Sequence, residues 1–418
     1  MKIIHLALAG VLSMSALGAH ENENAAKLEA EHSVRDVTEN IASSNAADKK
    51  SVAFGKLSGQ LRAMYAEYNQ KATGNMDTYS TAIGGYLHYE SINVNGFSIG
   101  AELAISKDLN FASGDEAKGE NNNELSSADG KYTELSQAYL SYTYENFNVK
   151  AGRILIDTPL ADSDDIRMIH NTFSGAVATY EYEGFAFMAG HLSKWQGYDA
   201  GLDTPWIKTG DSGTNFGGLS YDNGLELNLW YYNITKMTNA FYADIGYVYH
   251  LNSTTDLHGG VQYLKESELN NSGIEADIYG AFGEVLVGNV FFTLAYDHAN
   301  KNGVGQSSFS GFGGGALYTN MDTMILKEIT DNRSASSVVG SIGYAISDIN
   351  VAYAYGDFDG NANSSGPQEH IVEQDIIAEY PYKDFTFALT YAISQDRQSG
   401  VKTGYDWDRV QLLVAYNF

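Results

Sequence analysis

The chain has 418 residues, a formal net charge of −27, 43 glycines, 30 tyrosines and no cysteine. The lack of cysteine excludes a disulfide framework, cysteine-ligated zinc and thiol catalysis. The acidic charge argues against nucleic acid as a partner, because basic side chains are needed to displace counterions from phosphates. After the first twenty positions no run of eighteen apolar residues occurs, which excludes internal transmembrane helices.

The N-terminus has the pattern of a secretory signal. Lys2 supplies a positive start, residues 3–17 are mainly apolar, and Ala16-Leu17-Gly18 places small residues at the cleavage spacing. We therefore predict a signal peptide over residues 1–19. A short buried helix is the alternative, and the polar sequence that begins at His20 favours the signal.

Residues 20–52 differ in composition from the rest of the chain. They are rich in alanine and glutamate and contain no aromatic residue. We predict a polar periplasmic extension here, with a docking or plug segment as the alternative.

After Val52 apolar and polar residues alternate with period two. From Phe385 to Ser394 every odd position is bulky and apolar, and residues 97–106 and 225–232 repeat the pattern. Such alternation predicts strands that have one apolar and one polar face.

The connections between these strands alternate in length. Short Gly, Asn and Asp turns of hairpin type lie at residues 93–96, 145–146, 183–184, 222–224, 252–255, 288–289, 347–350 and 381–384. Mostly longer polar connections lie at residues 69–77, 110–130, 155–172, 194–214, 235–238, 265–272, 299–333, 357–370 and 396–405. These connections predict eighteen strands with both termini on the short-turn side.

Loops sorted by length in this way are typical of a transmembrane barrel with short periplasmic turns and an apolar outer face. A closed ring leaves no strand edge open to aggregation. We therefore predict an all-β, transmembrane antiparallel β-barrel of about eighteen strands over residues 53–418, located in the bacterial outer membrane. The chain ends on Phe418, on an alternating strand, and this resembles the C-terminal signal that outer-membrane barrels present to their assembly machinery.

One segment carries a resemblance to a known family. It contains, in order, Gly152-Arg153, Thr158-Pro159-Leu160, Asp164-Asp165-Ile166-Arg167-Met168 and Asn171-Thr172-Phe173. This series resembles the third external loop of the OprD-type family of outer-membrane porins. The resemblance implies an eighteen-stranded barrel in which this loop folds inward and forms the constriction.

A second segment resembles the same family more loosely. Gly311 to Gly315, followed by Tyr318-Thr319-Asn320-Met321, is similar to the family's glycine-rich seventh loop, which approaches the channel. Two features depart from the family pattern: the N-terminal extension is longer than expected, and Ala316 stands where a proline is usual.

The constriction motif supplies the first set of candidate site residues, which are Asp162, Asp164, Asp165, Arg167 and His170. Opposed charges across a narrow aqueous path set a transverse field that orients permeating solutes. The alternative is that the aspartates only cap turns and pair with Arg167, and that His170 makes one ordinary hydrogen bond.

Strand parity supplies candidate residues of the pore wall. The acidic ones are Glu102, Glu226, Asp244, Asp297, Glu373, Asp375 and Glu379, and the basic ones are Arg62, Lys150 and Arg409. The resemblance implies that carboxylate-importing relatives carry a basic ladder along the wall. Since that ladder is thin here, we predict a cation preference, with a substrate-specific porin for small organic acids or amino acids as the alternative.

Other chemistry has weak support. Asp357, Asp359 and Asn361 have the oxygen spacing of a calcium loop but lack its distal glutamate, so a Gly/Asn turn is the alternative. We predict no catalytic residue, no resident metal and no other cofactor.

The sequence thus predicts a water-filled channel for passive diffusion of ions and small hydrophilic solutes. Its expected partners are these solutes, outer-membrane lipid and lipopolysaccharide, and the barrel-assembly machinery, with a homotrimer as one assembly. A barrel enzyme such as an outer-membrane lipase and a surface adhesin with a sealed lumen are the rival hypotheses.

Overall fold

The computed structural model describes residues 50–52, 54–71, 76–363, 366–398 and 406–418. The signal peptide predicted over residues 1–19, and all but the last residues of the extension predicted over 20–52, lie outside the described residues. Those boundaries stay predictions.

Eighteen long strands form the wall of a closed barrel. They are β2 (Gly55–Gln70), β3 (Thr78–Ser91), β4 (Phe97–Asp108), β5 (Lys131–Tyr144), β6 (Phe147–Ile154), β9 (Thr172–Tyr182), β10 (Phe185–Gln196), β12 (Thr214–Asp222), β13 (Leu225–Ile234), β14 (Thr238–Asn252), β15 (Thr255–Glu268), β16 (Ala276–Val287), β17 (Val290–Ala299), β18 (Ala335–Ile346), β19 (Ile349–Gly360), β20 (Glu369–Tyr382), β21 (Phe385–Asp396) and β22 (Trp407–Asn417).

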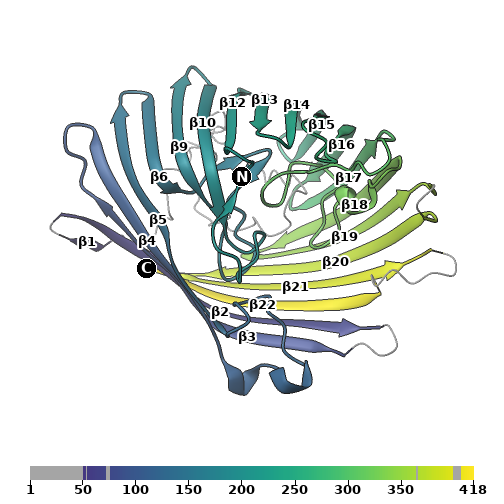
Figure 1. The fold of residues 1–418 in the computed structure, drawn as a ribbon, viewed down its shortest axis with the longest axis horizontal. Helices are drawn as coiled ribbons and strands as arrows, with labels where there is room; N and C mark the ends of the chain where they lie inside the picture. Colours follow the sequence, from purple (N-terminus) through teal and green to yellow (C-terminus); the bar gives the residue numbers. More distant parts are fainter. Residues whose placement is uncertain (1–49, 53, 72–75, 364–365, 399–405) are drawn as a thin grey trace.

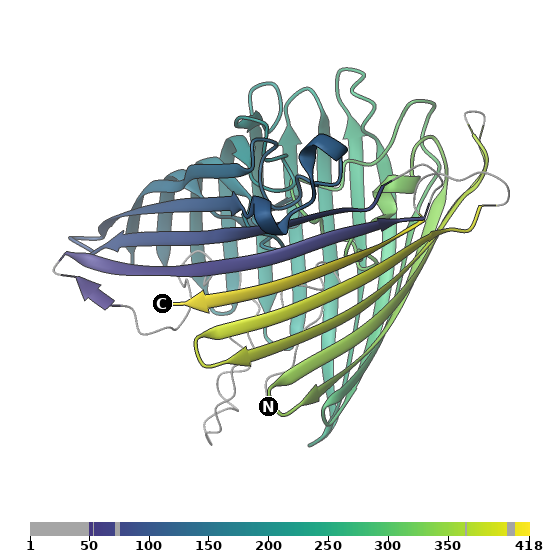
Figure 2. The same ribbon diagram turned by 90° about the horizontal axis from the view of Figure 1, so that it is seen from below.

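Each wall strand pairs antiparallel with the next along the chain, and β22 pairs with β2 to close the ring. Figure 2 shows this seam, where the purple β2 lies beside the yellow β22. The predicted barrel of eighteen strands is therefore confirmed.

The short turns fall where the sequence places them. The β9–β10 turn, for example, consists of Glu183 and Gly184, which have φ angles of 46° and 84°. Positive φ at both central residues is what a two-residue hairpin turn needs to match the twist of its strands. Glycine, asparagine and other turn-forming residues therefore set the strand ends at this rim.

Seven shorter elements complete the described structure. They are β1 (Lys50–Val52), β7 (Asp157–Thr158), β8 (Ala161–Asp162), β11 (Ile207–Lys208) and the 3-10 turns η3 (Asn110–Ala112), η4 (Glu116–Lys118) and η5 (Leu326–Ile329). Within the described ranges, no helix has the length and hydropathy needed to cross a bilayer.

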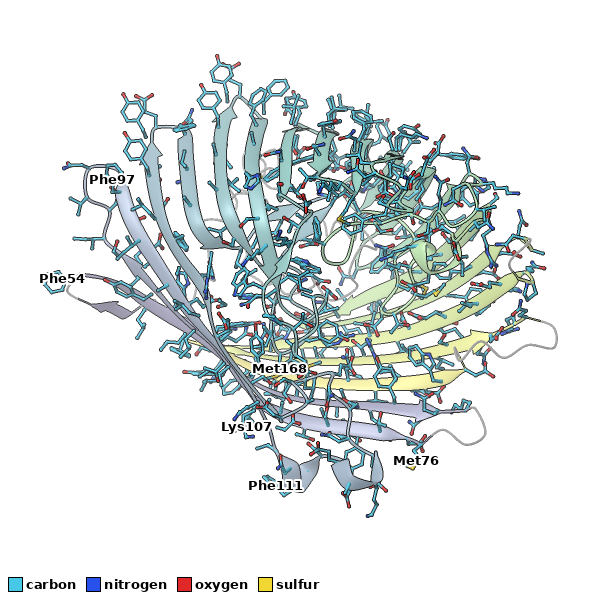
Figure 3. The ribbon with its side chains drawn as sticks, in the orientation of Figure 1. Phe54, Met76, Phe97, Lys107, Phe111 and Met168 are labelled. Atoms are coloured by element: carbon cyan, nitrogen blue, oxygen red, sulfur yellow. The ribbon has the colours of Figure 1, made fainter. Side chains whose placement is uncertain are left out.

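The two faces of the wall have opposite character. On β4, Phe97 and Ile99 are exposed on the outer face, whereas Glu102 and Ala104 are buried on the inner face. Figure 3 labels Phe97 at one end of this strand and Lys107 near the other. Apolar side chains that face outward suit contact with lipid.

Three loops at the end opposite the short turns contribute to the interior, namely residues 109–130, 155–171 and 300–334. Figure 1 shows the turns η3 and η4 of the first loop outside the ring, and its later part reaches the lumen through Glu124. The other two loops meet backbone to backbone, since the Asp162 amide donates to the Phe312 carbonyl oxygen at 2.9 Å. Glycine permits this approach, because a Cβ at Gly313 (φ 113°) would lie 2.6 Å from the Asp162 carbonyl oxygen. The glycine-rich run thus packs against the constriction loop.

The seam yields a prediction. The amide and carbonyl of Gly59 both hydrogen-bond to Phe418, each at 3.0 Å, so deleting Phe418 removes two of the bonds that close the ring. We expect lower outer-membrane yield and a lower temperature of heat modification on gels. Phe418→Leu, which keeps the backbone bonds, is the control, and full surface abundance of the truncated chain would contradict the expectation.

Candidate pore constriction

Four charged side chains meet inside the barrel, each from a different segment. Arg167 comes from loop 155–171, Glu124 from loop 109–130, Asp322 from loop 300–334 and Arg409 from β22. We name them the four-charge cluster.

The four-charge cluster alternates in sign. The Arg167 Nε donates to Glu124 Oε1 at 2.8 Å, and Arg409 Nη1 reaches the same oxygen at 3.1 Å. Arg409 also forms an ion pair with Asp322, and Arg167 Nη1 lies 4.0 Å from Asp322 Oδ1. None of these side chains is more than 4% exposed, so each charge depends on its partners rather than on water.

Tyrosine rings support the two guanidinium groups. The Arg167 guanidinium carbon lies 4.9 Å from the centre of the Tyr198 ring, and that of Arg409 lies 5.7 Å from the centre of the Tyr68 ring. These distances fall within the range of cation–π attraction.

Arg62 on β2 and Asp165 form a second ion pair beside this cluster. Arg62 Nη1 donates to Asp165 Oδ1 at 2.7 Å and to the Arg167 carbonyl oxygen at 2.6 Å. Burial acts to raise the pKa of Asp165, but the Arg62 guanidinium outweighs it and lowers that pKa. The Asp165 side chain is 46% exposed and that of Arg62 only 4%, so water reaches the acidic partner.

His170 ends the constriction loop in a polar contact with the wall. Its Nε2 lies 2.9 Å from Glu102 Oε1, and its ring stacks on Tyr86 with the ring centres 4.2 Å apart. Burial acts to lower the pKa of His170, but the Glu102 carboxylate outweighs it and raises that pKa. Tyr86 also accepts the His170 amide at 2.7 Å and donates to Asp165 at 3.0 Å, so one tyrosine holds two points in the second half of the loop.

Asp162 and Asp164 are partly exposed and lie near two further aspartates, Asp157 and Asp199. Asp162 Oδ1 accepts the Asp164 amide at 3.0 Å, which is the turn-capping arrangement. Withdrawal from bulk water raises the pKa of Asp164 to about 7, with Asp199 adding to the effect, and raises that of Asp162 strongly, with Asp157 adding to it.

The pairing within the loop differs from the simple alternative drawn from sequence. Arg167 forms ion pairs with Glu124 and Asp322 and with none of the loop's own aspartates, all of which lie in the described residues. Among those aspartates, Asp165 forms an ion pair with an arginine, and that arginine is Arg62. The reason is geometric: loop 155–171 crosses the lumen, so its side chains reach the wall and the other loops before they reach each other.

The ten residues assigned to the pore wall by parity all lie on the inner face. Seven are buried, namely Arg62, Glu102, Asp297, Glu373, Asp375, Glu379 and Arg409. Three are partly exposed, namely Lys150, Glu226 and Asp244.

Three of the buried acidic residues lie beneath loop 300–334 and do not face open lumen. Asp297 accepts the Thr319 amide at 2.9 Å, Glu373 accepts the Thr323 amide at 2.9 Å, and Asp375 accepts the Asp322 amide at 3.1 Å. These three carboxylates anchor the loop, which strand parity cannot reveal because it does not show what covers a side chain.

Sequence reasoning missed the two acidic members of the four-charge cluster. Asp322 directly follows the segment Tyr318 to Met321, so that motif carried a usable signal. Glu124 lies in a polar loop without periodic pattern, and nothing in its neighbourhood marks it. Only the folding of loop 109–130 into the barrel brings it to Arg167.

The segment with calcium-like spacing makes ordinary contacts. Asp357 lies 3.1 Å from His370, and Asp359 accepts from Gln368 at 2.7 Å. Over the described part of the chain, no three or more His, Cys, Asp or Glu side chains are grouped to hold a metal ion. Calcium binding at Asp357, Asp359 and Asn361 stays a prediction.

A closed barrel with a glycine-rich loop packed on a charged constriction loop agrees with one family model, described as outer membrane porin, OprD family, which matches residues 52–418. The chain belongs to the OprD family of outer-membrane porins. It is thus an outer-membrane channel protein for small solutes, and both its family and its fold are those of porins rather than enzymes.

Solved structures show the same fold at low identity. OccAB4 of Acinetobacter baumannii is 17% identical with a TM-score of 0.73, covering 90% of this chain and 100% of its own. OpdQ of Pseudomonas aeruginosa is 16% identical (TM-score 0.71, covering 87% and 97%), and OpdK of the same species, solved with vanillate, is 17% identical (TM-score 0.69, covering 87% and 98%). No curated protein sequence matches the chain.

The four-charge cluster yields a prediction about Glu124. Glu124→Gln leaves Arg167 and Arg409 with only Asp322 as a carboxylate partner, and breaking a buried ion pair in this way costs about 3–5 kcal/mol. We expect a lower temperature of heat modification and a shift of selectivity toward anions. Glu116→Gln, at an exposed position in the same loop, is the control, and equal behaviour of the two variants would refute the role of Glu124.

A second prediction concerns pH. A carboxyl group whose pKa is raised to about 7, as that of Asp164 is, is charged above that pH and neutral below it. Preference for cations should therefore fall as the pH drops from about 8 to about 6. Reversal potentials over this range test the expectation, and Asp164→Asn should flatten the response. An unchanged pH profile in that variant would show that another group titrates.

Proposed function

We propose that this porin favours cations over anions among the small hydrophilic solutes that pass it. One observation carries the proposal: the arginines at the constriction are buried and ion-paired, whereas several carboxylates there reach water. Arg62 and Arg167 are each less than 9% exposed, while Asp165 and Asp199 are exposed.

The charges at the constriction do not balance. Arg62 is matched by Asp165, and the two arginines of the four-charge cluster are matched by Glu124 and Asp322. Asp162, Asp164 and Asp199 have no arginine or lysine within ion-pair distance among the described residues. Charges in the narrow water of a pore are screened less than charges on an outer surface, so these carboxyl groups attract cations at a pH above their raised pKa values.

The wall nearer the short turns has the same sign. Glu226 and Asp244 are partly exposed on neighbouring strands, and Lys150 is the basic residue assigned by parity to this region. Glu226 lies 3.0 Å from His258 Nε2. A cation entering from the short-turn side thus meets the carboxylates of Glu226 and Asp244.

The proposal includes no enzymatic activity. Its partners are the solutes, the surrounding lipid and lipopolysaccharide, and the assembly machinery, which would engage β22 and its terminal Phe418. A homotrimer stays a prediction from sequence.

A second candidate is a specific porin for small organic acids or amino acids. Two guanidinium groups, those of Arg167 and Arg409, share the single oxygen Glu124 Oε1, and a solute carboxylate that displaced Glu124 would find both. OpdK, solved with vanillate, shows that a protein of this fold has been crystallised with a small organic molecule.

Reversal potentials in a potassium chloride gradient separate the two candidates. We expect potassium to be more permeable than chloride, and the double variant Asp164→Asn, Asp199→Asn to lower the permeability ratio by roughly twofold or more. Asp348→Asn, at an exposed short turn, is the matched control. A wild-type channel that prefers chloride, or that is blocked by millimolar carboxylates and not by amines, would favour the second candidate.

A further inference from the structure

Two lysines face each other on the outer surface of the barrel. In the antiparallel pair β4–β5, Lys107 is directly opposite Lys131, and both side chains are exposed. Directly opposed side chains have Cβ atoms about 4.5–5.5 Å apart, and like charges in that position repel. The chain has 52 acidic and only 25 basic residues, so two lysines in directly opposed positions are unexpected from composition.

The lysine pair lies at the rim that faces outside the cell. Lys107 precedes loop 109–130 and Lys131 follows it, at the end of the barrel opposite the short periplasmic turns. Along β4 the outward row continues to Ile105 and Leu103, both exposed and apolar. The two ammonium groups therefore lie next to the lipid-facing surface.

The protein itself does little to neutralise this pair. Lys107 Nζ donates to the Gly130 carbonyl oxygen at 2.9 Å, and Lys131 Nζ lies 3.4 Å from Asp129 Oδ2. The Lys131 and Asp129 side chains are 66% and 59% exposed, and an exposed ion pair of this kind contributes little.

The same arrangement occurs a second time. Lys194 on β10 is directly opposite Lys208 on β11, and both are exposed at the same rim. Lys208 Nζ donates to the Asp211 carbonyl oxygen at 2.9 Å. Between the two lysine pairs, Arg153 is bound by Glu134 at 2.7 Å.

An exposed apolar side chain follows the first pair along the chain. Phe111 in η3 comes four residues after Lys107 and is 88% exposed, and Figure 3 labels both residues toward the same end of the wall. An aromatic side chain beside basic ones is suited to an interface that holds both acyl chains and charged head groups.

We propose that the Lys107–Lys131 pair binds a phosphate group of lipid A in the outer leaflet, and that the Lys194–Lys208 pair is a second contact of the same kind. A phosphate between two ammonium groups turns their repulsion into two charge-assisted hydrogen bonds. Lipid A is the source of phosphate that this position favours, because the pair borders the lipid-facing surface at the outer rim.

The test measures heat modification of the purified full-length protein in detergent with EDTA present, so that divalent ions cannot bridge carboxylates to phosphate. Bisphosphorylated lipid A should raise the transition temperature, and lipid A without phosphates should do so at least threefold less. Inorganic phosphate alone should have no comparable effect at the same concentration. A full effect from dephosphorylated lipid A, or from free phosphate, would overturn the proposal.

Charge variants give a second, independent measure. Lys107→Gln with Lys131→Gln should weaken the apparent affinity for bisphosphorylated lipid A at least threefold. Without lipid A the same change should leave the transition temperature unchanged or higher, since it removes repulsion. Lys56→Gln with Lys383→Gln, at exposed positions near the periplasmic rim, is the matched control.

Equal lipid A affinity of the two double variants would also overturn the proposal. If the first variant does not fold, the comparison of the two forms of lipid A on the wild-type protein still decides the question.

Discussion

Hydrogen bonds from the backbone of loop 300–334 to carboxylates of the wall are the interaction on which the interior of this barrel depends. Glu266, on β15, accepts the Phe309 amide at 2.9 Å, and Asp297, Glu373 and Asp375 accept the amides of residues 319, 323 and 322. An irregular loop inside a barrel exposes amides that strands would have paired. Acidic side chains on the inner face supply the missing acceptors.

The position of the constriction follows from this anchoring. Because the Asp322 and Thr323 amides are fixed by Asp375 and Glu373, the Asp322 side chain meets Arg409 on β22. Arg409 shares Glu124 with Arg167. The four-charge cluster thereby joins loops 109–130, 155–171 and 300–334. A substitution in one of these loops that removes a charge should therefore alter the ion pairs made by the other two.

The lumen has an apolar side and a charged side. Phe312 packs edge-on against Trp195 and Phe309, with ring centres 5.4 and 4.8 Å apart, within a large buried apolar cluster that includes Trp230 on β13. The charged contacts gather instead toward strands at or near the seam, β2, β4 and β22, and toward β20. Apolar packing holds the loops against one side of the lumen. Water access to the charged groups is therefore set by the polar contacts on the opposite side.

The sequence by itself determined the wall of this protein. Alternation along segments such as Phe385 to Ser394, and the glycine and asparagine turns between segments, identified eighteen strands, the closed ring and the lipid-facing surface, because these properties depend on neighbours two residues apart. The constriction motif identified Asp165, Arg167 and His170 as inward residues through a family resemblance.

Only the tertiary structure decided their partners. Glu124 reaches Arg167 across 43 positions of the chain and Arg409 across 285, and Glu373 faces inward as parity predicts yet is covered by a loop about fifty residues away in sequence. Period-two patterns specify which face of a strand a side chain occupies, but burial and charge pairing inside the lumen depend on how three long loops fold over that face.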